Sequence, residues 1–155
     1  MATAVDEMPG SYDLDLADAI GVLKAIAAGE AEGGRRLAQW AEMTGDPKLA
    51  ATLRFITVRE NSHAELFSRR LSELGETVDL GAVPAEAAYL SMLADPAVAE
   101  REKASCVLGG AEFFAEVERR IDAGAYDQLT ARLLAWYVAE ERDSQDRLRR
   151  TGVAD

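Results

Sequence analysis

The sequence predicts a single all-α domain, a four-helix bundle made of two helical hairpins joined by a long crossover. Apolar residues recur at steps of three and four along every long segment, which is the spacing of one helix face. No alternating β-branched run bounded by turn residues is present, so strands are not expected. Asp46-Pro47 and Asp95-Pro96 each place a capping residue before a proline, which is a helix-start signal.

The first half of the chain predicts one hairpin. We expect residues 1–13 to be disordered and the bundle to occupy residues 14–150. The first helix is expected over about 14–44 and the second over about 46–74, where Gly75 follows in the usual position just past a helix. The turn between them is short, so the two helices are expected to be antiparallel.

The second half predicts another hairpin after a crossover over residues 75–94, which includes a short helix candidate from Pro84 to Leu93. Helices are expected over about 95–123 and 127–150. The halves also resemble each other: a shift of 80 residues pairs identical residues at five of the twelve positions from 49 to 60. An internal repeat of two hairpins places similar half-sites face to face.

Composition limits the class of partner. The chain has 155 residues, the size of one domain, and a net charge of -11, which disfavours nucleic acid and anionic membranes. No apolar run approaches the ~20 residues of a membrane span, and the acidic start lacks the features of an export signal. The single cysteine, Cys106, excludes an intramolecular disulfide and a site built from several thiolates. We therefore expect a cytoplasmic protein.

Glu60 and His63 interrupt the apolar stripe of the second predicted helix. Residues three apart lie one turn above each other, so both side chains can reach one cation. Burying this pair is unfavourable unless something neutralises it, and a metal ion is the simplest candidate. The alternative interpretation is a hydrogen-bonded polar pair in the core. Glu140 and Asp143 repeat the spacing on the last helix.

The other two helices offer one carboxylate each. Glu30 lies in the apolar stripe of the first helix and is as far from Gly45 as Glu60 is, whereas Glu32 shares a face with arginines and is expected in solvent. On the helix 95–123, Glu112 is level with Glu140 and is preferred because a ligand must first be at the right height. Glu116 and Glu118 remain alternative candidates for the ligand on this helix.

The ligand set predicted from the residues is Glu30, Glu60, His63, Glu112, Glu140 and Asp143. Clustered carboxylates repel by roughly 4 kcal/mol per close pair at an effective dielectric of 20, so we expect two divalent ions among them. Oxygen-rich ligation with one imidazole suits iron or manganese, and zinc is also possible. No catalytic residue is expected beyond the metal ligands.

These residues resemble the ferritin-like superfamily, and within it the rubrerythrin-like carboxylate-bridged di-iron proteins. The resemblance covers about residues 14–150 and implies a ferritin-like bundle in which Glu60 and Glu140 bridge two irons, Glu30 and Glu112 are terminal ligands and His63 binds one iron. It implies an oxidoreductase that oxidises iron or a small substrate with O2 or peroxide. The chain departs from the pattern because Asp143 stands where a second histidine is expected.

Two alternatives to the di-iron oxidoreductase follow from that departure. The first is a metal-free, degenerate bundle that acts as a binding or structural protein, most simply as a homodimer. The second is a mononuclear site on His63, Glu60 and Glu30, with Glu140 and Asp143 outside the ligand set.

Overall fold

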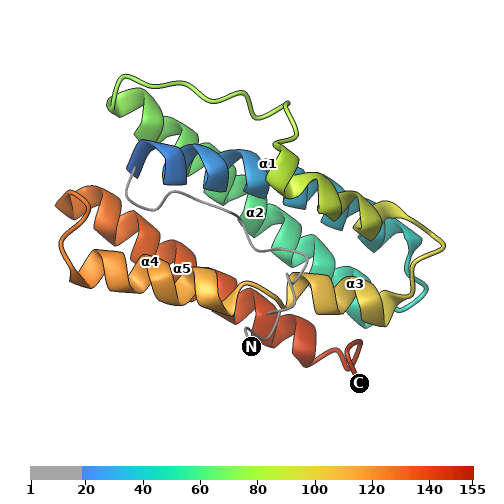
Figure 1. Cartoon of the computed structure of the whole chain (residues 1–155). Coiled ribbons are helices and arrows are strands. Elements are labelled where there is room, and N and C mark those ends of the chain that lie inside the picture. The colour runs from blue at the N-terminus through green and yellow to red at the C-terminus, as the bar shows by residue number, and fades with distance from the viewer. Residues whose placement is uncertain (1–18) are drawn as a thin grey trace, which may run out of the picture.

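The computed structural model describes residues 19–155, and its secondary structure over that range is entirely helical. Two antiparallel hairpins lie against each other, and none of the described helices is both long and apolar enough to cross a membrane (Figure 1). The elements are α1 (Ala19–Met43), α2 (Pro47–Glu73), the 3-10 helix η1 (Ala85–Ala94), α3 (Glu100–Val107), α4 (Ala111–Asp122) and α5 (Gln128–Arg149).

The first hairpin follows the prediction closely. The Asp46 carboxylate accepts hydrogen bonds from the backbone N–H groups of Lys48 (2.9 Å) and Leu49 (3.3 Å), and Pro47 occupies the first helical position of α2. Gly75 follows α2 with φ +80°, a conformation that glycine adopts without strain. The predicted helices over 14–44 and 46–74 are confirmed within the described range. The predicted disorder of residues 1–13, and residues 14–18, lie outside it.

The crossover runs along α1 before it reaches the second hairpin. It contains the expected short helix, which is the 3-10 helix η1 and packs against α1. Arg35 on α1 donates a hydrogen bond of 2.8 Å to the carbonyl oxygen of Leu80, which fixes the start of the crossover to the helix. As a result α1 is covered on more than one side, and every residue from Ile26 to Gly34 is buried.

The single helix predicted over residues 95–123 is wrong, because this segment contains two helices. Asp95 accepts a hydrogen bond from the N–H of Ala97 in a turn, and helix α3 begins only at Glu100. The helix then ends at Val107, and Gly110 has φ +92° before α4 begins. Adjacent glycines each disfavour a helix interior by about 1 kcal/mol relative to alanine, so Gly109-Gly110 is the weakest point of this segment.

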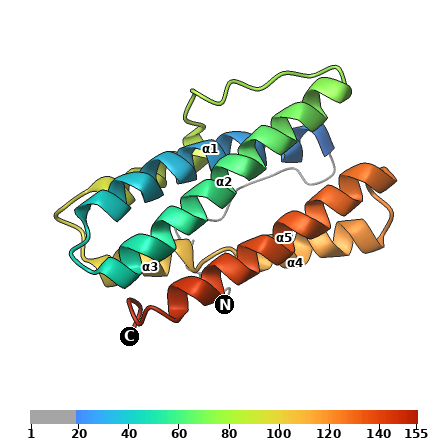
Figure 2. The ribbon, with the colours of Figure 1, turned by 180° about the vertical axis from the view of Figure 1, so that it is seen from behind.

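The second hairpin joins this interrupted rod to α5. Both views show α3 and α4 following one another beside α5, with α5 facing α2 of the first hairpin (Figure 2). The carboxylate of Asp127 accepts a hydrogen bond of 3.0 Å from the N–H of Thr130 and so caps α5. The helix predicted over 127–150 is confirmed as Gln128–Arg149.

The core consists of two apolar clusters rather than one. The first lies toward the α4–α5 turn and contains buried residues of α1, α2, α4 and α5, among them Phe67, Phe114 and Leu134. The second lies toward the α1–α2 turn and adds residues of η1 and α3, among them Trp40 and Leu93. On each rod nine or ten residues separate the buried members of the two clusters: 28–36 on α1, 57–66 on α2, 105–113 on the interrupted rod formed by α3 and α4, and 139–147 on α5. The candidate site lies in that intervening layer.

Candidate metal centre

Glu30 and His63 form the centre of the polar layer. Both side chains are buried, His63 completely, and Nδ1 of His63 lies 3.0 Å from Oε2 of Glu30. The hydroxyl of Tyr137 on α5 donates a hydrogen bond of 3.1 Å to the other oxygen of Glu30. Both members were predicted from the sequence, and the structure brings them together.

Glu60 lies beside them, one turn before His63 on α2 and against Gly33 of α1. A Cβ atom on Gly33 would collide with Oε2 of Glu60, so glycine is required for the carboxylate to occupy this position. Burial, followed by the nearby charges of Glu30 and Glu141, raises the pKa of Glu60 well above its ordinary value. The structure therefore places a carboxyl group whose ionised form is disfavoured at a position where a bound cation would favour that form.

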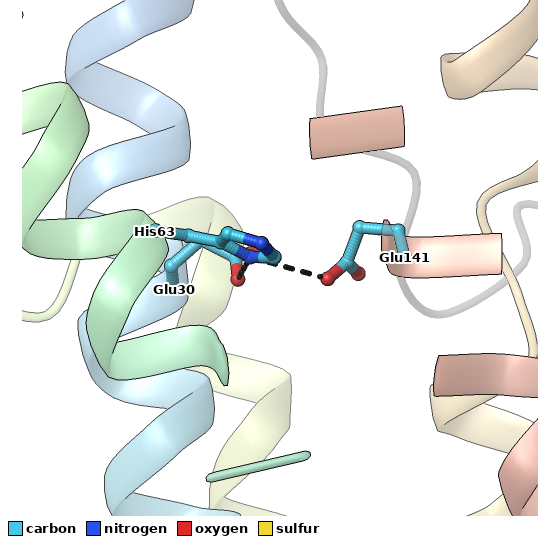
Figure 3. Close-up of side chains that lie close together, drawn as sticks. All are labelled: Glu30, His63 and Glu141. Carbon is cyan, nitrogen blue, oxygen red and sulfur yellow. Dashed lines mark hydrogen bonds and ion pairs between the residues drawn. The ribbon is translucent and has the colours of Figure 1, made fainter. Parts of the chain in front are cut away.

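Glu141 completes the cluster from α5. Figure 3 shows its carboxylate reaching across the interior toward Glu30 and His63. Its Oε1 lies 3.5 Å from Nδ1 of His63, is shielded from solvent and has no hydrogen-bond partner among the described residues. Burial and the charge of Glu30 raise the pKa of Glu141 to about 7, although His63 and Arg59 oppose that change. A buried carboxylate oxygen without a donor is a candidate ligand atom.

His63 is held as a cation when no metal is present. Burial alone would lower its pKa, but the carboxylates of Glu141 and Glu30 outweigh that effect and raise the pKa to about 10. Its second nitrogen, Nε2, lies 2.8 Å from Oε2 of Glu140. The imidazolium thus bridges carboxylates from α1 and α5, and a metal ion would have to replace a proton.

The donor atoms fit a transition metal. One ligand atom from each of Glu30, His63 and Glu141 lies within 4.8 Å of the others. Ligands bound to one ion at about 2.0–2.2 Å lie no more than about 4.4 Å apart, so only small side-chain movements are needed. Two carboxylates and an imidazole, with Glu60 beside them, are a donor set that iron, manganese and zinc accept.

Two predicted ligands on α5 have other partners. Glu140 is partly exposed, and besides His63 it lies 3.6 Å from Nε of Arg59. Asp143 accepts hydrogen bonds of 2.7 Å from both Arg59 and Arg147, which lower its pKa to about 2. The structure does not bring Asp143 to the cluster.

The predicted carboxylate of the third helix is also elsewhere. Glu112 is exposed to solvent in the first turn of α4, directly after the helix break. Of the two alternatives, Glu118 is paired with Arg142 and Glu116 with Arg119 and Arg120. None of the three reaches the cluster.

Glu32 was expected in solvent but is buried. The residue is only 1% exposed. Its carboxylate pairs with Arg35 at 2.8 Å and with Arg36 at 2.6 Å. The crossover covers this face of α1, and Arg35 binds the crossover at the carbonyl oxygen of Leu80. Glu32 thus lies beside arginines, as expected, but is shielded from solvent. Glu32 therefore belongs to the contact with the crossover and not to the candidate centre.

Glu141 is the site residue that the sequence pattern missed. The shift of 80 residues pairs Glu60 with Glu140, but the buried positions of α2 and α5 correspond under a shift of 81, which pairs Glu60 with Glu141 and His63 with Ser144. The doublets Leu133-Leu134 and Glu140-Glu141 make both registers plausible. Leu148 could have decided between the two registers. The buried Phe67 corresponds to Leu148 under the shift of 81, but to Arg147 under the shift of 80.

A partly enclosed cavity of about 70 Å³ adjoins the cluster. Carboxylates of Glu30, Glu60 and Glu141 line one part of it. The remaining walls come from η1, from the break between α3 and α4, and from small or apolar side chains, and they include Gly29, Gly33, Leu37, Tyr89, Leu90, Leu93, Val107, Gly109, Gly110, Phe113, Phe114, Tyr137 and Gln145.

Comparison of the chain with protein-family models, with curated proteins and with solved structures gives no match.

Proposed function

We propose that this chain binds one transition-metal ion through Glu30, Glu60, His63 and Glu141 and uses it as a redox centre. The observation that carries the proposal is the buried Oε1 of Glu141, which lies at ion-pair distance from Nδ1 of His63 (3.5 Å) and has no hydrogen-bond partner among the described residues. Three other features support it: the convergence of acids from three helices, the space that Gly33 leaves for Glu60, and the adjoining cavity.

A single ion is favoured because Arg59 supplies a positive charge on the other side of His63. Its Nη1 lies 2.7 Å from Oδ2 of Asp143, 3.1 Å from the carbonyl oxygen of Glu140 and 3.1 Å from Oγ of Ser144. Three oxygen atoms around one cationic nitrogen resemble the surroundings of a hard metal ion. The guanidinium therefore takes the place that a second ion would need.

The residues have separable tasks in this proposal. Glu30, Glu60 and Glu141 supply negative charge, and Nδ1 of His63 faces Glu30 and Glu141, so it is the nitrogen that would bind the ion. Nε2 would then keep its proton and donate to Glu140, which fixes the ring orientation. The bound ion would supply electron transfer to O2 or peroxide.

The finer expectations from the sequence belong to this proposal. Two antiparallel hairpins that bury acids midway along their helices support a ferritin-like, rubrerythrin-like origin. Iron or manganese is the expected ion, and zinc is the alternative. We do not expect a second iron, because Arg59 occupies the place that it would need. A cytoplasmic homodimer remains our expectation from the composition alone.

Elemental analysis of the purified chain, expressed with iron, manganese and zinc supplements, tests the proposal. We expect about one ion per chain in the wild type and close to none in Glu30→Gln or His63→Ala. Glu32→Gln is the matched control, because Glu32 is a buried acid two residues away whose partners are Arg35 and Arg36. Equal metal content in the Glu30 and Glu32 variants would reject the site.

A metal-free bundle is the second candidate function, and the protonated state of His63 favours it. An imidazolium between Glu30 (3.0 Å) and Glu140 (2.8 Å) is already neutralised without a metal. In that case the wild type would hold no ion after supplementation, and His63→Ala would only destabilise the fold. Binding of the chain to itself or to another protein would then be the activity to look for.

A further inference from the structure

We propose that the cavity beside the carboxylates is a binding pocket for a small neutral molecule, which would lie next to the metal ion. Contact with the ion rests on the function proposed above, whereas the pocket itself does not. Glu30, Glu60 and Glu141 are among the residues that line it, together with Val107, Gly109 and Gly110 at the break between α3 and α4.

The size of the cavity limits the ligand. The cavity measures about 70 Å³. Because a water molecule takes a share of roughly 30 Å³ in the liquid, the space suits a molecule of roughly two to four heavy atoms. A larger organic molecule would have to extend beyond this volume.

The helix break creates this space. Gly109 and Gly110 line the cavity without a side chain, and the amide of Gln145 donates to the carbonyl oxygens of Val107 (3.1 Å) and Gly109 (2.8 Å). Those two bonds satisfy carbonyl groups at the end of α3 that a continuous helix would have paired internally. Under the shift of 81 residues Glu30 of α1 corresponds to Ala111, the first residue of α4. The segment formed by α3 and α4 therefore contributes no carboxylate to the pocket at this position.

The charges around the cavity favour a neutral ligand. Three carboxylates against one divalent ion leave a net negative charge. Among the described residues, those that line the cavity include no lysine or arginine that could attract an anion. Aromatic and aliphatic side chains from η1 and α4, such as Leu93 and Phe113, supply apolar surface, and the other polar lining residues, such as Gln145, are uncharged. An anion of the same size would therefore be excluded.

Nitric oxide and azide separate these cases, because the first is neutral and the second is an anion of similar size. With the full chain loaded with ferrous iron, we expect nitric oxide to bind and to give the visible absorption and electron paramagnetic resonance signals of an iron nitrosyl. The ratio of nitric oxide affinity to azide affinity should exceed that of a ferrous aminocarboxylate chelate in solution by at least about tenfold, the equivalent of about 1.4 kcal/mol. A ratio equal to that of the chelate would overturn the charge argument.

Val107→Phe fills the pocket without touching a candidate ligand. We expect it to weaken nitric oxide binding at least about tenfold while metal content stays at the wild-type value. Leu108→Phe is the matched control, because the neighbouring residue does not line the cavity. Phe113→Trp is a second filling variant, to be used if the first one lowers the melting temperature. Unchanged nitric oxide affinity in a folded filling variant would overturn the proposal.

Xenon tests the pocket without a metal ion. Under xenon pressure, the amide resonances of Val107, Phe113 and Phe114 of the metal-free chain should shift and saturate, and Val107→Phe should abolish the change. Xenon binding by a chain that takes up no metal after iron, manganese and zinc supplementation would support the pocket and reject the proposed function. No xenon response in the wild type would reject the pocket, whatever the metal content.

Discussion

At the scale of single residues, the two ring nitrogens of His63 have different surroundings. Nδ1 faces Glu30 and Glu141 in the interior, while Nε2 faces Glu140, which is partly exposed. A metal bound at Nδ1 would make Glu140 an outer carboxylate that orients the ring, and not a ligand as the sequence predicted. The two adjacent glutamates of α5 would then have different roles.

Glu140→Ala and Glu141→Ala should therefore differ in their effect on metal binding. We expect Glu141→Ala to remove a ligand and to abolish stoichiometric binding. Glu140→Ala should keep one ion per chain but lower the affinity by about 10–100-fold, as losses of such outer partners usually do. Competition with a coloured chelator measures both affinities. The reverse order of the two variants would show that Glu140 is the ligand.

The pH dependence of metal binding follows from the protonation of the site. His63 has its pKa raised to about 10 and Glu141 to about 7, so a metal ion must displace a proton from His63 at neutral pH and from Glu141 as well below pH 7. We expect log Kd to fall by at least about one per pH unit between pH 7.5 and 9, and more steeply below pH 7. Titrations across this range measure the slope. A flat profile would contradict the protonated site.

Arg59 should control how many ions the chain binds. Replacement by methionine removes the charge that lies among Asp143, Glu140 and Ser144, so Arg59→Met should bind one ion more than the wild type. Arg147→Met is the control, because Arg147 also pairs with Asp143 and stacks on Phe55 but has no bond to Glu140. Elemental analysis with excess manganese measures the difference. Identical ion counts in the two variants would reject this role for Arg59.

The sequence was sufficient to find the centre of the site but not its boundary. Glu30, Glu60 and His63 were predicted because charged residues inside an apolar stripe are rare and costly. Glu141 was missed because two adjacent glutamates differ by only about 100° of helix rotation, which periodicity over a few turns does not resolve. Arg59 was missed as a partner of Asp143 because contacts between α2 and α5 depend on how the hairpins pack.

At the scale of elements, the interrupted rod is the main departure from the predicted helices. Three of the four long helices end within a few residues of their expected bounds, because caps and glycines mark those ends locally. The break at Gly109-Gly110 had a local signal too, but an apolar stripe continues across it from Val107 to Phe114. Tertiary contacts decide between a glycine that is tolerated and one that ends a helix, so the pattern alone favoured continuity.

Gln145 should be the residue that stabilises this break. Its amide donates two hydrogen bonds to carbonyl groups of the segment, and its side chain is buried. Gln145→Ala leaves both acceptors without this donor, so we expect a loss of about 1–3 kcal/mol in the free energy of unfolding. Urea denaturation measures it, with Gln128→Ala at the exposed start of α5 as the control. A loss no larger than that of the control would show that the break is stable without Gln145.

At the scale of the whole molecule, a layer of charge divides the hydrophobic core. The clusters around Phe67 and Trp40 are each apolar, but between them lie Glu30, Glu60 and His63. Filling that layer with hydrophobic side chains would join the clusters into one core. Such a layer is not what selection for stability alone would favour, which is consistent with the metal centre proposed above.

Glu60→Leu should reverse its effect on stability when metal is added. In the metal-free protein, burial, followed by the charges of Glu30 and Glu141, raises the pKa of Glu60, and leucine removes both the buried polar group and the repulsion. We expect the metal-free variant to be more stable than the wild type by about 1–3 kcal/mol, as with other buried charges replaced by apolar residues. With metal at about 100 times its Kd, the wild type should gain about 2.7 kcal/mol and the variant less.

Urea denaturation with a chelator and with excess metal measures both halves of that prediction. Ser62→Leu is the control, because Ser62 is an exposed residue on α2 whose hydroxyl bonds only to the carbonyl oxygen of Val58. If Glu60→Leu destabilises the metal-free chain, then the carboxylate stabilises the fold by itself and the layer is structural. The opposite outcome is a variant that is more stable than the wild type without metal but gains less stability when metal is added. In that case the stability lost by keeping Glu60 in the metal-free chain is linked to metal binding.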